Sequence, residues 1–259
     1  MKRSTLIFDI ETSFNIGIFW RTGYNQTIQH DDIITERAII CVSWKWEDED
    51  EVYSLTWDKN QSDKQLLKEF IKELNKADEI IAHNGDRFDI KWLRTRCLKH
   101  KLPMFPKYQS IDTLKQARGQ FNFNSNKLDY IAQFLKVGAK TKHDGKPMWK
   151  KIVLKNDPVA LKKMVKYCEN DVLILEKVYK RFKEHTQPKI NKAVLAGEHK
   201  FQCPRGTNPH IYINKTVTTA SGVIKRYMHC KKDGCNTRFF ISNKTYEQYV
   251  MWRLKNNLK

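Results

Sequence analysis

Four acidic residues occupy positions from which their carboxylates could meet. Asp9 and Glu11 lie two residues apart in an apolar, strand-like segment, and side chains at that spacing leave the same face of a strand. Asp89 follows another strand-like segment, and Asp171 lies on a long predicted helix four residues after Tyr167, which places these two on one helical face. Carboxylate oxygens are the ligands that Mg²⁺ and Mn²⁺ prefer. The pattern therefore predicts a site for two such ions.

The chemistry that suits this group is phosphodiester hydrolysis. The anionic oxygens of a phosphodiester repel a nucleophile, and two divalent ions about 4 Å apart can activate a water and stabilise the leaving oxygen. We predict that Asp9, Glu11, Asp89 and Asp171 hold two Mg²⁺ or Mn²⁺, with Asp9 bridging both. Tyr167 would orient the attacking water, because a hydroxyl with a pKa of about 10 is a poor general base. The alternatives are a packing role for Tyr167 and an inactive relic or surface coincidence for the acids.

The elements that must position these residues predict an α/β fold. Strands are expected at 4–10, 37–46, 52–57 and 79–84, with the acidic run 47–51 as a hairpin turn. Helices are expected at 63–76 (with Ser62 as N-cap), 88–100, near 111–118, 127–136 and 158–183. Hairpin-linked strands followed by a crossover favour a mixed sheet, three strands antiparallel and the others parallel, flanked by helices.

Three motifs in this order resemble those of the DEDD superfamily of 3′–5′ exonucleases, over roughly residues 4–182. They are Phe8-Asp9-Ile10-Glu11-Thr12, the Asn-x-x-x-Phe-Asp segment from Asn84 to Asp89, and Tyr167-Cys168-Glu169-Asn170-Asp171. The tyrosine, with Val165 where a sister branch has histidine, is similar to the Tyr branch that includes polymerase proofreading domains. Ile111-Asp112-Thr113 and Lys127-Leu128-Asp129 resemble the B-family polymerase subgroup.

The resemblance implies a ribonuclease H-like fold and a metal-dependent 3′–5′ exonuclease that releases nucleoside 5′-monophosphates from single-stranded DNA. No polymerase domain follows, so the expected enzyme is a stand-alone, phage-type exonuclease. Thr12, Asn84 and Phe88 would contact the substrate, although Asn84 could simply hold a loop and Phe88 could pack in the core. Asp112 is expected to be a structural hydrogen-bonding partner. An exoribonuclease remains an alternative, because contacts to the 2′-hydroxyl group cannot be recognised in a sequence. A non-catalytic nucleic-acid-binding protein on the same fold is the other alternative.

Charge supports a nucleic-acid partner and divides the chain. The sequence has 48 Lys+Arg and 29 Asp+Glu, a net charge of +19. Residues 186–259 hold 14 basic and 3 acidic residues, a net +11, against +8 for residues 1–185. We predict an exonuclease domain at 1–186 and a basic, nucleic-acid-binding module at 197–259.

The sequence has no long apolar run and no signal peptide, so we expect a cytoplasmic protein (host cytoplasm if phage-encoded) with no membrane partner. Protein partners in replication or repair are left open.

A second basic feature precedes the long helix. Residues 136–151 hold six lysines, among them Lys142, together with Trp149. A flexible basic segment with an aromatic residue can follow a single strand and stack on a base, so Lys142 and Trp149 are predicted substrate contacts. The alternative is a solvated loop with Trp149 anchored in the core.

Three cysteines of the basic module predict a structural zinc site. Cys203 lies in one turn, Cys230 and Cys235 in a second, and a strand-prone stretch joins them, which is the plan of a zinc ribbon. The first turn lacks its second cysteine, so a fourth ligand is needed. His210 is the first choice, because a short loop can return it to Cys203, and His199 and His229 are the runners-up.

Overall fold

The computed structural model describes residues 5–23, 27–47, 49–104, 107–139, 145–206, 208, 210–232 and 235–258. The described chain divides into two compact units, the first ending at Val178 and the second beginning at Tyr179. This division falls within a helix, whereas the sequence places a boundary after that helix. The predicted limits of 1–186 and 197–259 remain a prediction.

The first unit is built on a five-stranded sheet with the order β5-β4-β1-β6-β7. The strands are β1 (Thr5–Thr12), β4 (Ile39–Trp46), β5 (Tyr53–Thr56), β6 (Glu79–Ala82) and β7 (Gln109–Asp112). β1, β4 and β5 pair antiparallel, while β6 pairs parallel with both β1 and β7. The predicted mixed sheet is therefore confirmed. A small separate hairpin joins β2 (Ile16–Gly17) to β3 (Ile33–Thr35), with the 3-10 turn His30–Asp32 between them.

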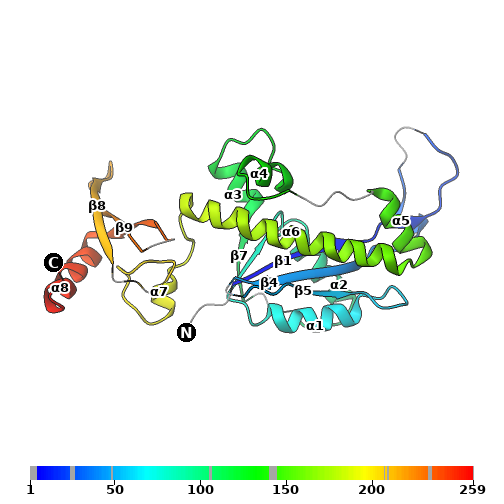
Figure 1. Ribbon diagram of the computed structural model, residues 1–259, viewed down its shortest axis with the longest axis horizontal. Coiled ribbons are helices and arrows are strands. Elements are labelled where there is room, and N and C mark those ends of the chain that lie inside the picture. The colour runs from blue at the N-terminus through cyan, green and yellow to red at the C-terminus, as the bar shows by residue number, and fades with distance from the viewer. Residues whose placement is uncertain are drawn as a thin grey trace. The chain divides into compact units, whose positions relative to one another are not determined.

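Helices cover both faces of this sheet (Figure 1). Leu6, Phe8 and Ile10 of β1 pack in one core with α1 (Lys64–Leu74) and α2 (Asp89–His100). The other face packs on α5 (Lys146–Lys155) and α6 (Pro158–His185), while α3 (Thr113–Gln120) and α4 (Leu128–Phe134) follow β7. The odd-numbered residues of β1 therefore point towards α6.

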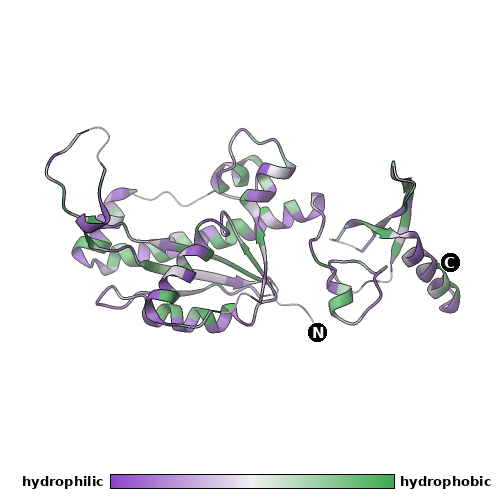
Figure 2. Ribbon diagram, turned by 180° about the vertical axis from the view of Figure 1, so that it is seen from behind, coloured by the Kyte–Doolittle hydropathy of each residue, from purple (hydrophilic) through white to green (hydrophobic). Residues whose placement is uncertain are grey.

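The hydropathy pattern agrees with these two layers. The helices alternate between hydrophilic and hydrophobic residues along their length, as Figure 2 shows. Although α6 has 28 residues, no helix among the described residues is long and apolar enough to cross a bilayer.

Three local expectations are corrected. Residues 111 and 112 belong to β7 instead of a helix. This strand forms by pairing with β6, and a segment of four residues is too short to show a strand pattern in the sequence. Asp63 takes the N-cap position of α1 in place of Ser62. Residues 146–151 are the start of α5, so only part of the expected basic loop is irregular, and residues 140–144 lie outside the described chain.

The second unit has a three-stranded antiparallel sheet with the order β10-β9-β8. Its elements are α7 (Lys192–Leu195), β8 (Ile211–Thr218), β9 (Ile224–Cys230), β10 (Arg238–Ser242) and α8 (Asn243–Lys255). One face of the sheet and α8 enclose a small core that contains Phe201, Met228, Phe239, Ile241 and Tyr249. This core is small and includes Cys203 and Cys230, so the cysteines matter for its stability.

A buried ionic cluster ties α1 and α2 to β4 in the first unit. The Asp63 carboxylate, which is fully buried, accepts hydrogen bonds from Arg96 Nε at 2.6 Å and Nη2 at 2.8 Å and from the Ile39 N–H at 2.9 Å. His100 Nε2 lies 2.7 Å from the same carboxylate. Burial by itself raises the pKa of Asp63, but the hydrogen bonds from Arg96 and Ile39 outweigh it and hold that pKa below its usual range.

We predict that Arg96→Met lowers the free energy of unfolding by roughly 3–5 kcal/mol at neutral pH, because a buried carboxylate loses its main partner. The stability that Asp63 contributes is present above the ordinary carboxyl pKa and is lost as pH falls through its lowered folded value. The deficit of the variant should therefore shrink in acid. Urea titrations at several pH values measure both effects. Lys76→Met, which breaks an exposed pair with Glu73, is the control and should cost less than about 1 kcal/mol; an equal loss in both variants would contradict the role of Asp63.

Candidate active site and metal centre

The predicted carboxylates of β1 and α6 converge. One carboxylate oxygen from each of Asp9, Glu11 and Asp171 lies within 4.8 Å of the other two. Asp9 and Glu11 share the face of β1 that points to α6, and they pair with Ser43 and Cys41 of β4. The register shifts between Glu11 and Thr12. Such a bulge ends regular pairing and re-aims the side chains beside it.

Asp89 reaches the same strand from α2. It is the first residue of that helix and is 2% exposed, and its Oδ1 accepts the Ile10 N–H at 3.3 Å. Parallel pairing between β1 and β6 covers only Thr5–Ile7, so the two strands have stopped pairing before Ile10. Burial, followed by the negative charge of Asp9, raises the pKa of Asp89 well above its usual range. A cation at this position would reverse that effect.

α6 is fixed against the sheet by polar contacts of residues between and after Tyr167 and Asp171. Lys45 of β4 and Glu176 form an ion pair of 2.9 Å whose side chains are 4% and 7% exposed. The Ser54 hydroxyl donates to Glu169 at 2.9 Å. The Cys168 thiol donates to the Asp9 carbonyl at 3.4 Å and lies 3.6 Å from its Oδ2. These contacts set the rotation of α6, which holds Asp171 buried in the group and Tyr167 one turn before it.

Asp112 organises the loop between β6 and α2. Its carboxylate accepts the backbone N–H groups of Asn84 at 3.0 Å and Asp86 at 3.3 Å, and it also caps α3. Asn84 has a φ of 70°, a left-handed conformation that asparagine tolerates better than most residues. This loop leads directly to Asp89. The contacts support the structural role expected for Asp112, whereas the role of the Asn84 side chain stays a prediction.

The other predicted substrate contacts are placed in different ways. The Thr12 hydroxyl accepts from Arg37 Nη2 at 2.7 Å, and its carbonyl accepts from Trp149 Nε1 at 3.0 Å. The structure thus brings Thr12 and Trp149 together and anchors the indole on α5. Phe88 is half-buried and packs edge-on against Trp92. Lys142 lies outside the described residues.

Several residues that shape the site were missed by sequence reasoning. They are Lys45 and Glu176, Cys168, and Arg37, which also donates to the Ser13 carbonyl. A signal existed for the first two, because Lys45 lies between two tryptophans in a strand-like segment and Glu176 follows the apolar run Leu173-Ile174-Leu175. A buried charge in such a run needs a partner. The sequence does not say which one.

The donor chemistry of the acidic group fits divalent cations. All four side chains offer carboxylate oxygen, and three of them already lie close enough to share an ion. Burial and then the charge of Asp9 raise the pKa of Asp89, and a divalent cation held here would offset both. The residues present therefore fit Mg²⁺ or Mn²⁺, for which Asp9, Glu11, Asp89 and Asp171 are the candidate ligands.

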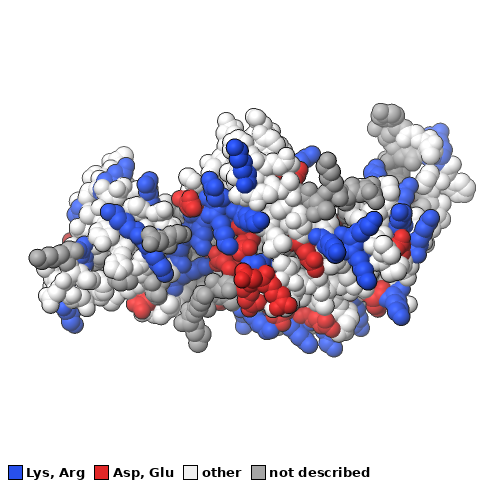
Figure 3. Space-filling view, in the orientation of Figure 1, with Lys and Arg blue, Asp and Glu red and all other residues white. Residues whose placement is uncertain are grey.

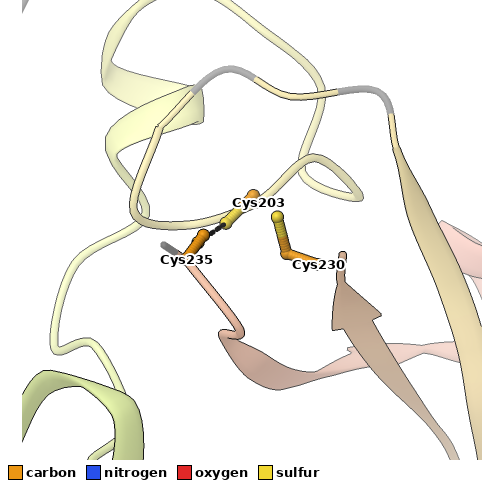
Figure 4. Close-up of side chains that lie close together, drawn as sticks. All are labelled: Cys203, Cys230 and Cys235. Carbon is orange, nitrogen blue, oxygen red and sulfur yellow. Dashed lines mark hydrogen bonds between the residues drawn. The ribbon is translucent and has the colours of Figure 1, made fainter. Parts of the chain in front are cut away.

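Three cysteines form a second candidate metal centre. The Sγ atoms of Cys203, Cys230 and Cys235 all lie within 4.8 Å of one another and point towards a common centre (Figure 4). Cys203 and Cys235 are 3.5 Å apart, and the Asn208 amide donates to Cys230 Sγ at 3.1 Å. Hydrogen bonds from the Cys203 thiol and then from Thr237 lower the pKa of Cys235. The same contact raises the pKa of Cys203, so the pair shares one proton and favours a thiolate at Cys235. A soft metal would take thiolates from all three cysteines.

The three candidate histidines do not join this group. His210 is exposed, and its described contacts are those of its backbone, whose N–H donates to Asn208. His199 stacks on Phe201. His229 neighbours Cys230 on β9 and so points to the opposite face of the sheet. Among the described residues, the structure brings together three of the four predicted zinc ligands and leaves the His210 ring outside.

Asp89→Asn should raise the melting temperature of metal-free protein, because it removes a buried charge that Asp9 repels. The same change should reduce or abolish the stabilisation that Mn²⁺ gives, because one ligand is lost. Thermal unfolding with and without Mn²⁺ measures both. Glu73→Gln, which changes a half-buried acid of α1, is the matched control and should change neither property by a comparable amount. A metal-free Asp89→Asn variant that melts at a lower temperature would contradict the repulsion.

Purified protein should contain about one zinc ion per chain by elemental analysis. Cys230→Ser should lose the ion and unfold the second unit, because metal binding and folding are coupled in small domains. Cys97→Ala, which removes a buried thiol of the first unit, should keep it. Full zinc content in Cys230→Ser would show that this cysteine is not a ligand.

Comparisons with known proteins agree with this geometry. The family model of the RNase H superfamily matches residues 6–183. Among solved structures, a family B DNA polymerase from the hyperthermophilic archaeon Pyrobaculum calidifontis is similar, with a TM-score of 0.53 and 15% identity. The match covers 71% of this chain and 26% of the polymerase chain, so the chain spans about a quarter of the polymerase's length, and identity at this level shows the fold alone. No curated protein matches the sequence.

The family match extends over well more than half of the chain and contains the three converging acids and Asp89. Together with this fold, the carboxylates indicate a metal-dependent nuclease that acts on nucleic acid. The chain therefore belongs to the RNase H superfamily.

Proposed function

We propose that the protein is a metal-dependent 3′–5′ exonuclease that removes nucleotides from the 3′ end of single-stranded DNA and releases nucleoside 5′-monophosphates. The observation that carries this proposal is the convergence of Asp9, Glu11 and Asp171, with Asp89 held against the same strand. The motif order and Tyr167 favour the exonuclease branch over other nucleases of this fold.

The acidic residues would act as a preformed ligand set. Two Mg²⁺ or Mn²⁺ held by Asp9, Glu11, Asp89 and Asp171 would supply the charge that activates a water and stabilises the leaving 3′ oxygen. The protein fixes these carboxylates on a strand and two helices, so they need little rearrangement when a substrate arrives. The Cys168 thiol, by donating to the Asp9 carbonyl, joins the helix that carries Asp171 to the strand that carries Asp9.

Tyr167 would orient the attacking water. Its ring is 8% exposed, and the residue lies one turn before Asp171 on the same face of α6. Its hydroxyl can accept or donate a hydrogen bond without changing charge. Tyr167 would thus set the direction from which the water attacks, while the carboxylates and the metal ions they hold would stabilise the developing charge.

Substrate contacts would come from the rim of this group. Thr12 and Trp149 are linked by a hydrogen bond, so the backbone at the end of β1 is rigid where a nucleotide would lie. Phe88 is half-buried and could wedge against a terminal base, while Asn84 would shape the loop before it. Lys142 and the basic second unit, with its structural zinc at Cys203, Cys230 and Cys235, would hold the phosphate backbone.

The test is digestion of a 5′-labelled single-stranded oligonucleotide with Mg²⁺, beside an RNA strand of the same sequence. We expect a descending ladder on DNA, and Asp9→Ala should lower the rate by at least about a thousandfold, because the bridging ligand is lost. Early release of a labelled mononucleotide would show the opposite polarity. A ladder on RNA alone would identify an exoribonuclease, and binding without cleavage would leave only a nucleic-acid-binding protein.

Tyr167→Phe should reduce the rate by roughly 10²–10³ while leaving the affinity for Mn²⁺ unchanged, because it removes a water-positioning hydroxyl and no metal ligand. Tyr130→Phe, a change of the same kind on α4, is the control. Single-turnover rates and Mn²⁺ titrations separate the two properties. An unchanged rate in Tyr167→Phe would favour the packing role.

A further inference from the structure

The outer face of the β8-β9-β10 sheet has a composition that neither the catalytic group nor the cysteines explain. We propose that this face, defined as Tyr212, Lys215, Lys225, Tyr227, His229, Arg238 and Phe240, binds single-stranded nucleic acid by stacking unpaired bases on its rings and pairing phosphates with its cations. The proposal deepens the proposed function, on which it rests for the class of ligand.

The register of the sheet places these side chains together. Tyr227 of β9 pairs with Phe240 of β10 and with Lys215 of β8, and His229 pairs with Arg238 and Tyr212. Directly paired residues of antiparallel strands share a face. The face is therefore continuous across all three strands.

The other face of the same sheet is already occupied. Met228, Cys230, Phe239 and Ile241 alternate with the residues above and are buried. The Arg226 guanidinium on that side stacks on Tyr246 of α8 at 4.7 Å. α8 packs on this side of the sheet, so Tyr227 and Phe240 on the opposite side are not part of the core.

Aromatic rings and cations lie beside one another on the outer face. The Tyr227 and Phe240 ring centroids are 4.5 Å apart, and Lys215 Nζ lies 5.8 Å from the Tyr227 ring. Tyr212 has Lys231 Nζ 4.9 Å from its ring. Phe240 is 48% exposed, so its ring can receive a base. Tyr212 is 38% exposed, and the Arg253 guanidinium of α8 lies 5.9 Å from its ring as a second cation. A stacking surface flanked by cations is the arrangement that binds single strands without reading their sequence.

Charge complementarity selects the occupant. β8, β9 and β10 contain no aspartate or glutamate, while the outer face carries Lys215, Lys225 and Arg238. In Figure 3, Lys and Arg side chains far outnumber Asp and Glu on the visible side of the second unit. Such a face favours a polyanion. A duplex keeps its bases stacked inside and would use only the cations, so the exposed rings favour an unpaired strand.

The test measures binding in the full chain with Asp9→Ala, so that no strand is cut. Fluorescence anisotropy with a labelled oligothymidylate of about 20 nucleotides and with a duplex of equal length gives affinity at several salt concentrations. Tyr227→Ala with Phe240→Ala should weaken single-strand binding by at least about tenfold, since a base stacked on an aromatic ring is worth about 1–3 kcal/mol. The slope against salt should not change, because no cation is removed.

Matched variants separate stacking from charge and from folding. Tyr227→Phe with Phe240→Tyr keeps both rings and should bind normally, and Met251→Ala removes an exposed apolar residue of α8 and should have no effect. Lys225→Gln with Arg238→Gln should lower affinity for both strands and duplexes and make the salt slope shallower. Zinc content and melting temperature of each variant show that the second unit is folded.

Two results would overturn the proposal. One is unchanged single-strand affinity in folded Tyr227→Ala with Phe240→Ala, and the other is an equal loss on the duplex. The result is independent of cleavage. If the wild type cuts nothing but the rings govern binding, the exonuclease proposal fails and this inference stands; if the wild type cuts and the rings have no effect, the reverse holds.

Discussion

The repulsion among four carboxylates is the constraint on which the first unit depends. Asp9 and Glu11 leave β1 on one face, Asp171 approaches from α6, and Asp89 is buried beside them. Burial and then the charge of Asp9 raise the pKa of Asp89. Nothing in the group itself favours assembly, so the surrounding contacts must hold it together until a cation neutralises it.

Buried polar contacts hold the elements that carry the carboxylates in place. The Lys45–Glu176 pair is buried, and breaking it would leave a charge without its partner inside the protein. Such a pair adds little net stability, but it permits only one rotation and one height of α6 on the sheet. Asp112 does the same for the loop before Asp89 through backbone hydrogen bonds. Rigidity is thus supplied by groups that carry no catalytic chemistry.

The sequence predicts the acidic group better than its supports, and the reason is physical. A strand's two-residue period and a helix's four-residue spacing are local properties, so the shared faces of Asp9 with Glu11 and of Tyr167 with Asp171 follow directly. The Lys45–Glu176 pair joins residues 131 positions apart, and no local period reports such a contact. β7 was missed for a related reason, since only pairing with β6 makes Gln109–Asp112 a strand. The same limit applies to zinc: the cysteines converge as their turns suggest, whereas the position of the His210 ring depends on a loop conformation that spacing alone does not determine.

The net charge of +19 combines two opposite tasks. A polyanionic substrate must be attracted, yet the residues that would cut it are themselves anionic. The chain separates these demands: the carboxylates are gathered and largely buried in one unit, and the second unit presents strands without any acid. Attraction over a long range needs only cations, whereas holding an unpaired base needs a ring. An outer sheet face with both cations and aromatic rings would hold a single strand tightly. Because the rings add affinity without adding positive charge, this face would not compete with the metal ions at the acidic group for the substrate's phosphates.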